Sequence, residues 1–177
     1  MDIVIQPANL DLADSFRQAL DVVAREHRYL IFQEAPPLES TRKFIAQVLA
    51  KGWIQFYALH AGTVVGWCDV VRDERPGMTH IGRLGIGIVP EYRGRKIGAR
   101  LLTAAIADAF QKGITRIELE VFAANARAHA LYRKFGFVEE GRKRHARCLD
   151  GIYEDSICMA LFKTDPSLAS HTNPTNG

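Results

Sequence analysis

The stretch Ile86–Ala99, IGIVPEYRGRKIGA, leads from an apolar strand into a helix. Pro90 closes the strand, and a regular apolar pattern begins again at Ile97. The first amides of a helix have no partner inside the helix and lie at the positive end of its dipole, so this turn is suited to a phosphate group. The basic residues and glycines of the turn are Arg93, Gly94, Arg95, Lys96 and Gly98. On its own the pattern leaves open an ordinary basic connection between a strand and a helix.

Strands and helices alternate on both sides of this turn. Apolar runs predict strands at residues 1–6, 53–59, 63–72, 80–89, 115–122, 137–148 and 152–162. Periodic apolar stripes predict helices at residues 11–28, 39–51 and 97–112 and a short helix capped by Asn125. This order favours a single α/β domain over residues 1–162, with helices packed on a mixed sheet. We expect the polar, proline-containing segment 163–177 to be a disordered tail.

The composition is that of an ordinary globular protein, for which we expect no nucleic-acid partner and no membrane. The net charge is +3, and the basic cluster Arg142–Arg147 has no interleaved aromatic side chains, so a solvated strand face is favoured over a nucleic-acid binder. No apolar run approaches the ~20 residues that span a bilayer, and no leader pattern is found at residues 1–10. Three cysteines without metal-ligand spacing fit reduced thiols, so we expect a cytoplasmic protein without a metal site.

A second motif follows at residues 125–137, NARAHALYRKFGF. It resembles the Asn-x-x-Ala-x-x-Leu-Tyr-x-x-x-Gly-Phe signature of the GNAT superfamily of N-acetyltransferases. The earlier turn is similar to the pyrophosphate loop of that superfamily, Arg/Gln-x-x-Gly-x-Gly/Ala, which falls here on residues 93–98. Lys96 stands where the family usually has its first glycine. It either adopts a positive φ, at a strain of about 1 kcal/mol, or is helical and tolerant.

The resemblance implies a fold and a cofactor. The fold is a central mixed, mostly antiparallel sheet of about six to seven strands flanked by about four helices, with a V-shaped splay between strands 80–89 and 115–122. The cofactor is acetyl-CoA as cosubstrate, with no metal, and its pantetheine arm would pair with main chain freed by the splay. The residues that the resemblance assigns to cofactor binding are Ile86, Gly87, Ile88, Arg93, Gly94, Arg95, Lys96, Ile97, Gly98, Ala99 and Asn125.

Acetyl transfer needs a group that takes a proton from the amine and a group that protonates the departing thiolate. By resemblance, Tyr132 is the general acid. For the base we favour Glu120, which shares one strand face with Glu118 and precedes Asn125 by five residues. His80 is the second candidate, and a base acting through ordered water is the third.

The resemblance implies a transferase that acetylates a primary amine directly in a ternary complex. The end of the chain, residues 142–159, is similar to the amino-acid and phosphinothricin-type branch, so a small amine such as an amino acid is the expected acceptor. Phe32 and Glu34 are candidate walls of the amine site. The alternatives are a protein N-terminus or lysine as acceptor, and a non-catalytic coenzyme A binding module. A homodimer is a further expectation.

Overall fold

The computed structural model describes residues 2–164, so residues 165–177 of the expected tail lie outside the described part of the chain. A seven-stranded sheet forms the centre of the molecule, in the order β1-β2-β3-β4-β5-β7-β6. The strands are β1 (Val4–Pro7), β2 (Ile54–His60), β3 (Thr63–Arg72), β4 (Ile81–Ile88), β5 (Arg116–Phe122), β6 (Val138–Leu149) and β7 (Ile152–Phe162). The helices are α1 (Ala13–Ala24), α2 (Leu38–Lys51), α3 (Ile97–Gln111) and α4 (Ala126–Lys134), with 3₁₀ turns at Leu10–Leu12 and Pro90–Tyr92.

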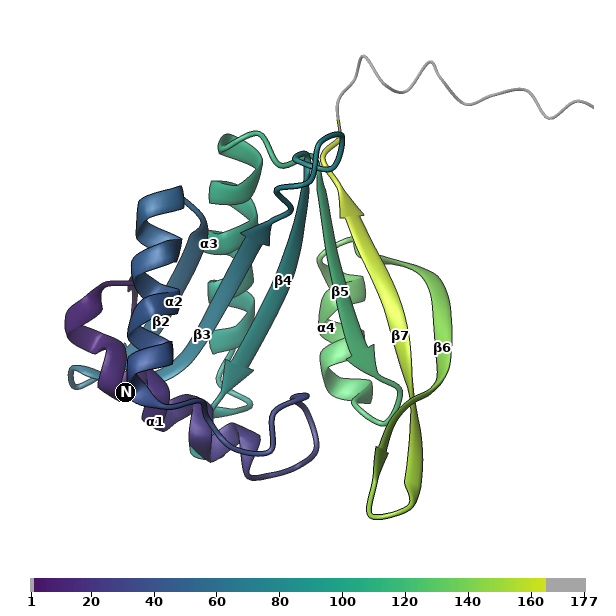
Figure 1. Ribbon diagram of the computed structural model, residues 1–177, viewed down its shortest axis with the longest axis horizontal. Helices are drawn as coiled ribbons and strands as arrows, with labels where there is room; N and C mark the ends of the chain where they lie inside the picture. The colour runs from purple at the N-terminus through teal and green to yellow at the C-terminus, as the bar shows by residue number, and fades with distance from the viewer. Residues whose placement is uncertain (1, 165–177) are drawn as a thin grey trace, which may run out of the picture.

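Strands β4 and β5 run parallel, while every other neighbouring pair in the sheet is antiparallel. They pair only through Ile81–Arg83, which lie opposite Arg116–Glu118. Beyond this short ladder the two strands diverge, as Figure 1 shows. The predicted mixed, mostly antiparallel sheet and its V-shaped splay are therefore confirmed. The splay leaves the β5-facing edge of Leu84–Ile88 without a strand partner.

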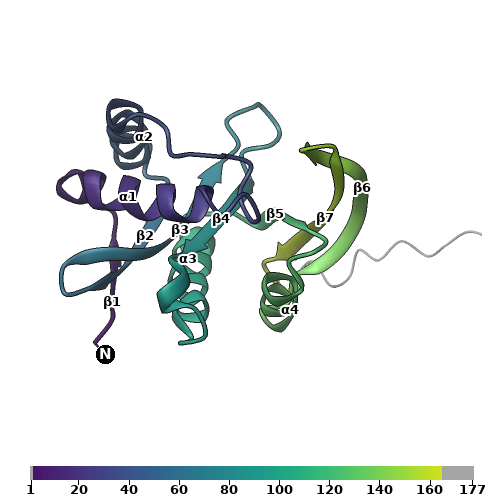
Figure 2. The same ribbon diagram turned by 90° about the horizontal axis from the view of Figure 1, so that it is seen from below.

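Helices cover both faces of the sheet (Figure 2), with α1 and α2 on one face and α3 and α4 on the other. We call these the α1 face and the α3 face. Alternation along β3 divides its side chains between two cores. Cys68 packs in the core on the α3 face. Trp67 packs in the core on the α1 face, where its ring meets Phe16 of α1 at 5.6 Å.

The first helix is shorter than its apolar pattern predicted, because it ends at Ala24 rather than near residue 28. His27 adopts a positive φ of 54°, which no α-helix continues. The Asp21 carboxylate accepts a hydrogen bond from the Ala35 amide at 2.9 Å. This contact directs the chain out of the helix and fixes the return of the long α1–α2 loop, residues 25–37.

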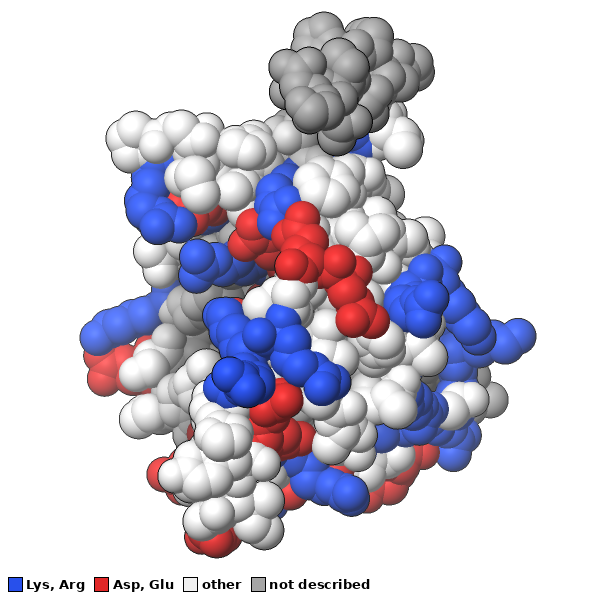
Figure 3. All heavy atoms as spheres, turned by 90° about the vertical axis from the view of Figure 1, so that its right-hand side faces the viewer, with Lys and Arg blue, Asp and Glu red and all other residues white. Residues whose placement is uncertain are grey.

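The basic cluster that the sequence analysis placed on an exposed strand lies on β6, the outer strand of the sheet. Three of its basic side chains form ion pairs with carboxylates. Arg142 pairs with Asp155 at 3.7 Å, Arg147 pairs with Glu154 at 2.5 Å, and Lys143 pairs with a carboxylate of β5. Figure 3 shows acidic and basic side chains intermixed over this side of the molecule. This arrangement is typical of a solvated strand face, as the sequence analysis favoured.

Candidate active site at the splay

The turn before α3 has the backbone that an anion requires. Gly94 and Lys96 both adopt positive φ, at 82° and 60°. Lys96 is the N-cap residue of α3 and adopts the left-handed conformation, so the alternative with a positive φ is correct. Such a conformation costs a non-glycine residue about 1 kcal/mol. No acidic residue occurs in the first turn of α3. The amides of Ile97, Gly98 and Ala99 are therefore unopposed by a carboxylate of their own turn.

Arg93 makes contacts that its place in the motif did not predict. Its guanidinium binds both carboxylate oxygens of Glu26, and its Nε donates to the Ile88 carbonyl oxygen at 2.9 Å. The guanidinium also lies 4.8 Å from the ring centroid of Tyr29. The side chain thus joins the α1–α2 loop to the end of β4, and Glu26 opposes much of its charge. Its hydrogen bond also engages the Ile88 carbonyl oxygen, although the Ile88 main chain was expected to face the cofactor.

Helix α4 contributes a basic residue that the sequence analysis missed. A Cβ placed on Gly94 would lie 3.5 Å from a terminal guanidinium nitrogen of Arg127, so this arginine stands beside the turn from the other side of the splay. Asn125 caps α4 by accepting from the Ala128 amide at 3.1 Å. Its side-chain oxygen serves the cap, which leaves the amide nitrogen as the group able to donate to a cofactor. Arg127 carried no sequence signal, because it falls on a variable position of the motif.

The residues around the splay fit the expected cofactor. The main chain of Ile86 and Gly87 belongs to the edge that β5 leaves without a partner. A Cβ on Gly98 would lie 3.2 Å from Ile88 Cδ1 and 3.3 Å from Leu131 Cδ2, so the absence of a side chain lets the start of α3 pack closely against β4 and α4. An extended amide-containing chain suits that free strand edge. A pyrophosphate suits the turn between Gly94 and Gly98.

Tyr132 lies on the α3 face, with its side chain buried in the core. Its ring centroid is 5.8 Å from that of Phe137. Burial is the main cause that raises the pKa of Tyr132 above its ordinary value, and electrostatic interaction with Cys68 adds to it. The phenol is therefore fully protonated at neutral pH. Within residues 2–164 no group accepts a hydrogen bond from its hydroxyl, and that oxygen is not among the fully buried polar atoms, so the proton is not committed to another side chain.

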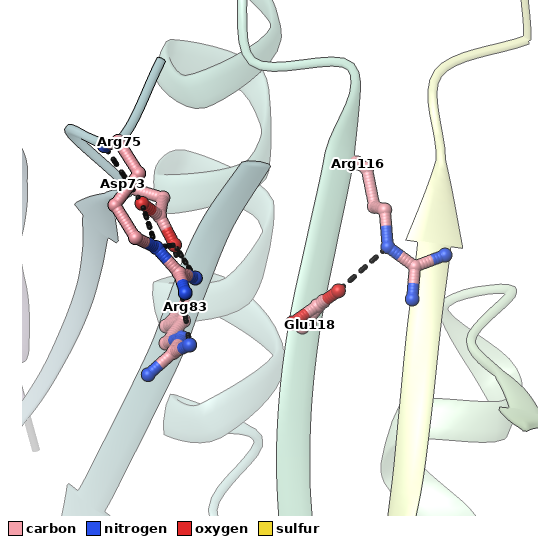
Figure 4. Close-up of polar contacts among 5 residues, drawn as sticks. All are labelled: Asp73, Arg75, Arg83, Arg116 and Glu118. Atoms are coloured by element: carbon pink, nitrogen blue, oxygen red, sulfur yellow. Dashed lines mark hydrogen bonds and ion pairs between the residues drawn. The ribbon is translucent and has the colours of Figure 1, made fainter. Parts of the chain in front are cut away.

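Glu118 and Glu120 project to the α1 face, as the strand pattern predicted, because Ile117, Leu119 and Val121 are buried on the other. Both carboxylates are already engaged. Arg116 donates from Nε to Glu118 at 2.7 Å, as Figure 4 shows. Lys143 and Ser156 both donate to Glu120, and the hydrogen bond from Lys143 is the main cause that lowers the pKa of Glu120.

Charged side chains also pair with one another at the end of the splay where β4 and β5 are hydrogen-bonded. Asp73 accepts from Arg75 at 2.5 Å and lies 3.9 Å from Arg83, the β4 residue that stands opposite Glu118 (Figure 4). His80 lies at this end too, where its carbonyl accepts from the amides of Thr115 and Arg116. It is about 20 Å along the strand from the Ile86 main chain, at about 3.3 Å per residue, which argues against its role as the base.

The α1–α2 loop carries the two residues proposed as walls of the amine site. The loop is tied to the β6–β7 hairpin, because Arg147 donates to the carbonyls of Leu30 and Arg28 at 3.3 and 3.4 Å. Phe32 is exposed, and Glu34 is exposed and pairs with Arg25 at 3.3 Å. Both stand on a loop held against the hairpin side of the splay, but their contact with an acceptor stays a prediction.

One polar group on the α1 face escaped the sequence analysis. Asp69 lies in the middle of β3, between Gln55 of β2 and Gly85 of β4, and paired residues of adjacent strands share a face. A Cβ on Gly85 would lie 3.0 Å from Asp69 Oδ2. Desolvation by burial raises the pKa of Asp69 to about 7. The signal available in the sequence was a single carboxylate inside the apolar run VVGWCDVV at residues 64–71.

Gln55 is buried, and its Nε2 is the one buried side-chain nitrogen or oxygen among the described residues that lacks a hydrogen-bond partner. Its Oε1 accepts a long hydrogen bond, 3.5 Å, from the Tyr57 hydroxyl. A buried amide without a partner costs about 1–3 kcal/mol, so this donor marks a position where a further polar atom belongs.

Within residues 2–164 no cluster of His, Cys, Asp and Glu side chains is arranged to hold a metal ion. In the same part of the chain no helix is both long enough and apolar enough to cross a membrane.

Comparison with known proteins connects this geometry to a family. The sequence profile of the Acetyltransferase (GNAT) family matches residues 18–137. An L-amino acid N-acetyltransferase of Escherichia coli is 32% identical over 111 residues, which are 62% of this chain and 68% of the relative. A ribosomal-protein-alanine N-acetyltransferase of Escherichia coli is 31% identical over 135 residues, which are 75% of this chain and 87% of the relative.

The fold is also that of a solved structure, a phosphinothricin acetyltransferase from Sinorhizobium meliloti in complex with acetyl-CoA. Its TM-score is 0.87 at 20% identity, covering 100% of this chain and 95% of that one. The profile match includes the phosphate turn before α3 and the motif around Tyr132, the two features on which the sequence resemblance rested. The chain therefore belongs to the GNAT family of acetyltransferases.

Proposed function

We propose that this protein transfers the acetyl group of acetyl-CoA to the primary amine of a small molecule such as an amino acid. The observation that carries the proposal is the splay of β4 from β5. It lies beside a phosphate-binding turn, with Tyr132 buried on the α3 face and carboxylates on the α1 face. The relative that acts on L-amino acids supports the acceptor class.

Two parts of the splay would bind acetyl-CoA. The amides of Ile97, Gly98 and Ala99, together with Arg127, would hold the pyrophosphate. The free edge of β4 would hold the pantetheine arm. When bound, acetyl-CoA supplies an activated acetyl thioester.

Tyr132 would protonate the sulfur that leaves. Burial keeps the phenol protonated at neutral pH, so its proton is available when the C–S bond breaks. Glu120 is the candidate base from the sequence, either directly or through water. Its ion pair with Lys143 keeps its carboxylate ionised but weakens it as a proton acceptor. Phe32 and Glu34 would line the amine site from the α1–α2 loop.

Thermal unfolding with and without acetyl-CoA, followed by thiol release against a panel of amines, tests the proposal. Ligand at about 100 times its dissociation constant should stabilise the fold by ~2.7 kcal/mol. A clear shift with thiol release for amino acids supports the proposed function. A shift without turnover for any small amine or peptide would favour a non-catalytic coenzyme A module, and no shift at all would remove the assignment of the turn at residues 93–98.

A protein acceptor is the second candidate, because one relative acetylates the alanine of a ribosomal protein. Peptides with a free N-terminal alanine and peptides with an internal lysine, compared with free amino acids at equal concentration, separate the two. A kcat/KM higher for either peptide than for every free amino acid would favour a protein acceptor.

A homodimer and a cytoplasmic location remain part of the proposal. The outer strand β6 leaves one edge of the sheet open, and such edges pair with another chain unless charge prevents it. Sedimentation equilibrium at low and high salt tests the dimer, and fractionation of cells tests the location.

A further inference from the structure

We infer that Asp69 accepts the proton of the acceptor amine, at a site formed by the cross-strand row Gln55–Asp69–Gly85 on the α1 face. The inference rests on the proposed acetyl transfer and assigns its base to a residue on β3 rather than to Glu120 on β5. It stands on four observations: the position of the row, the state of the competing carboxylates, a buried donor without a partner, and the surroundings of Asp69.

The row leads from the interior of the sheet to the splay. Asp69 lies directly opposite Gln55 on one side and opposite Gly85 on the other. Gly85 belongs to the part of β4 that β5 leaves unpaired. Because Gly85 has no side chain, its face is occupied by the Asp69 carboxylate, which lies 3.0 Å from the position of a Cβ there. The carboxylate therefore reaches β4 at the place where the strand edge is free.

The acid and this base stand on opposite faces of the sheet. Cys68 and Asp69 are consecutive on β3, so their side chains point to opposite sides. Tyr132 interacts electrostatically with Cys68 on the α3 face. Asp69 shares the α1 face with Trp67, whose ring lies over Gly87 so closely that a Cβ there would be 2.2 Å from it. An amine on the α1 face would thus meet Asp69, while a leaving group on the α3 face would meet Tyr132.

Three other carboxylates along the splay are engaged. Glu118 is bound by Arg116, Glu120 by Lys143 and Ser156, and Asp73 by Arg75. The Asp69 carboxylate has no hydrogen-bond or ion-pair partner within residues 2–164. The residue is partly buried rather than fully buried. A carboxylate without a partner is free to accept a hydrogen bond and then a proton from the amine of the substrate.

The buried amide nitrogen of Gln55 is an independent observation that points to a ligand at this site. Its side chain is 4% exposed, and its Nε2 has no partner in the described part of the chain. Gln55 and Asp69 are directly opposed residues, and the Cβ atoms of such pairs lie about 4.5–5.5 Å apart, so a polar atom beside the Gln55 amide would also lie near the Asp69 carboxylate. A water molecule or a polar atom of the acceptor at that position would satisfy the donor and bridge it to the carboxylate.

Burial keeps Asp69 protonated more readily than an exposed aspartate. Strand β2 faces it with Tyr57, β4 with Arg83 two residues from Gly85, and β5 with Glu118 and Glu120. The layer above, from α1, contributes Phe16, which stacks on Tyr57 at 5.1 Å. Desolvation by burial raises the pKa of Asp69 to about 7. A base is most effective when its pKa is near the working pH.

The proton balance of the step is complete. The acceptor enters as an ammonium, and its first proton passes to the Asp69 carboxylate and then to solvent. The free amine forms the C–N bond to the acetyl carbonyl carbon as the C–S bond breaks. The sulfur receives a proton from Tyr132, and Tyr132 regains one when the second amine proton is released. One acetyl thioester and one ammonium give one amide, one thiol and one proton.

The test is the pH profile of kcat/KM for wild type and Asp69→Asn, measured by thiol release with the best amine of the panel. We expect the wild-type profile to rise with pH through an apparent pKa near that of Asp69. We expect Asp69→Asn to lose this rise and about 100-fold in kcat/KM at neutral pH, with an unchanged thermal shift by acetyl-CoA. The unchanged shift shows that the variant folds and binds its cosubstrate.

Two further variants make the result decisive. Asp108→Asn is the matched control, because Asp108 lies on α3 and pairs only with Lys112 in the described residues, so its profile should equal that of wild type. Glu120→Gln should keep the rise with pH. If Glu120→Gln loses the rise and Asp69→Asn keeps it, the assignment to Asp69 is wrong and Glu120 is the base. If wild type acetylates no amine, the proposed function falls and this assignment with it.

Discussion

The replacement Asp69→Asn should make the protein more stable at neutral pH, which is unusual for a change in the middle of a sheet. Burial of Asp69 raises its pKa from 3.8 to about 7, because desolvation disfavours the charged form. Below the unfolded pKa the carboxyl is protonated in both states and costs nothing. As the pH rises toward the folded pKa, the unfolded chain ionises first, so the folded state loses stability over this window.

The magnitude follows from the size of the shift. A difference of about three pH units corresponds to about 4 kcal/mol at pH 7 and above, and to about 2 kcal/mol near pH 5. Asparagine has the same shape and does not titrate. The unfolding free energy of wild type minus that of Asp69→Asn should therefore fall by about 3 kcal/mol between about pH 4 and about pH 7.

Urea unfolding followed by far-UV circular dichroism measures this difference at each pH, with equal m values as the check that both proteins unfold alike. Asp108→Asn again serves as the control, since its exposed i,i+4 pair predicts a small and nearly constant difference. A difference for Asp69→Asn that is independent of pH, or that grows in favour of wild type as pH rises, would refute the claim that Asp69 is a desolvated carboxyl without a partner.

Three further changes probe the rest of the site. Tyr132→Phe should lower kcat about 100-fold and leave the acetyl-CoA thermal shift intact; unchanged kcat would remove the phenol from the acid role. Gly98→Glu should abolish the acetyl-CoA shift, because its Cβ would already lie 3.2 Å from Ile88 Cδ1 and its charge would oppose the phosphates, and retained affinity would show that the turn is not the phosphate site. Lys143→Met should raise the pKa of Glu120 toward its ordinary value of 4.5, measured by carboxyl NMR titration; an unshifted titration would mean that Lys143 does not bind Glu120 in solution.

The order of the elements, the turn before α3 and the motif around Tyr132 could be predicted from the sequence. Each of these is local: apolar periodicity, a helix start and a helix cap involve residues a few positions apart. The conformation of Lys96 was limited to two possibilities for the same reason. The end of α1 was misjudged, because the apolar pattern continues toward residue 28 and a contact between Asp21 and Ala35 decides where the chain turns.

Which charged groups are free to act depends on contacts between residues that are far apart in the sequence. Glu26 meets Arg93, and Lys143 meets Glu120, across separations in sequence that no local pattern spans. The row Gln55–Asp69–Gly85 exists only because three strands pair in one register. A shift of that register by one residue would turn Asp69 to the α3 face, so strand pairing, not composition, places a carboxylate beside the free edge of β4.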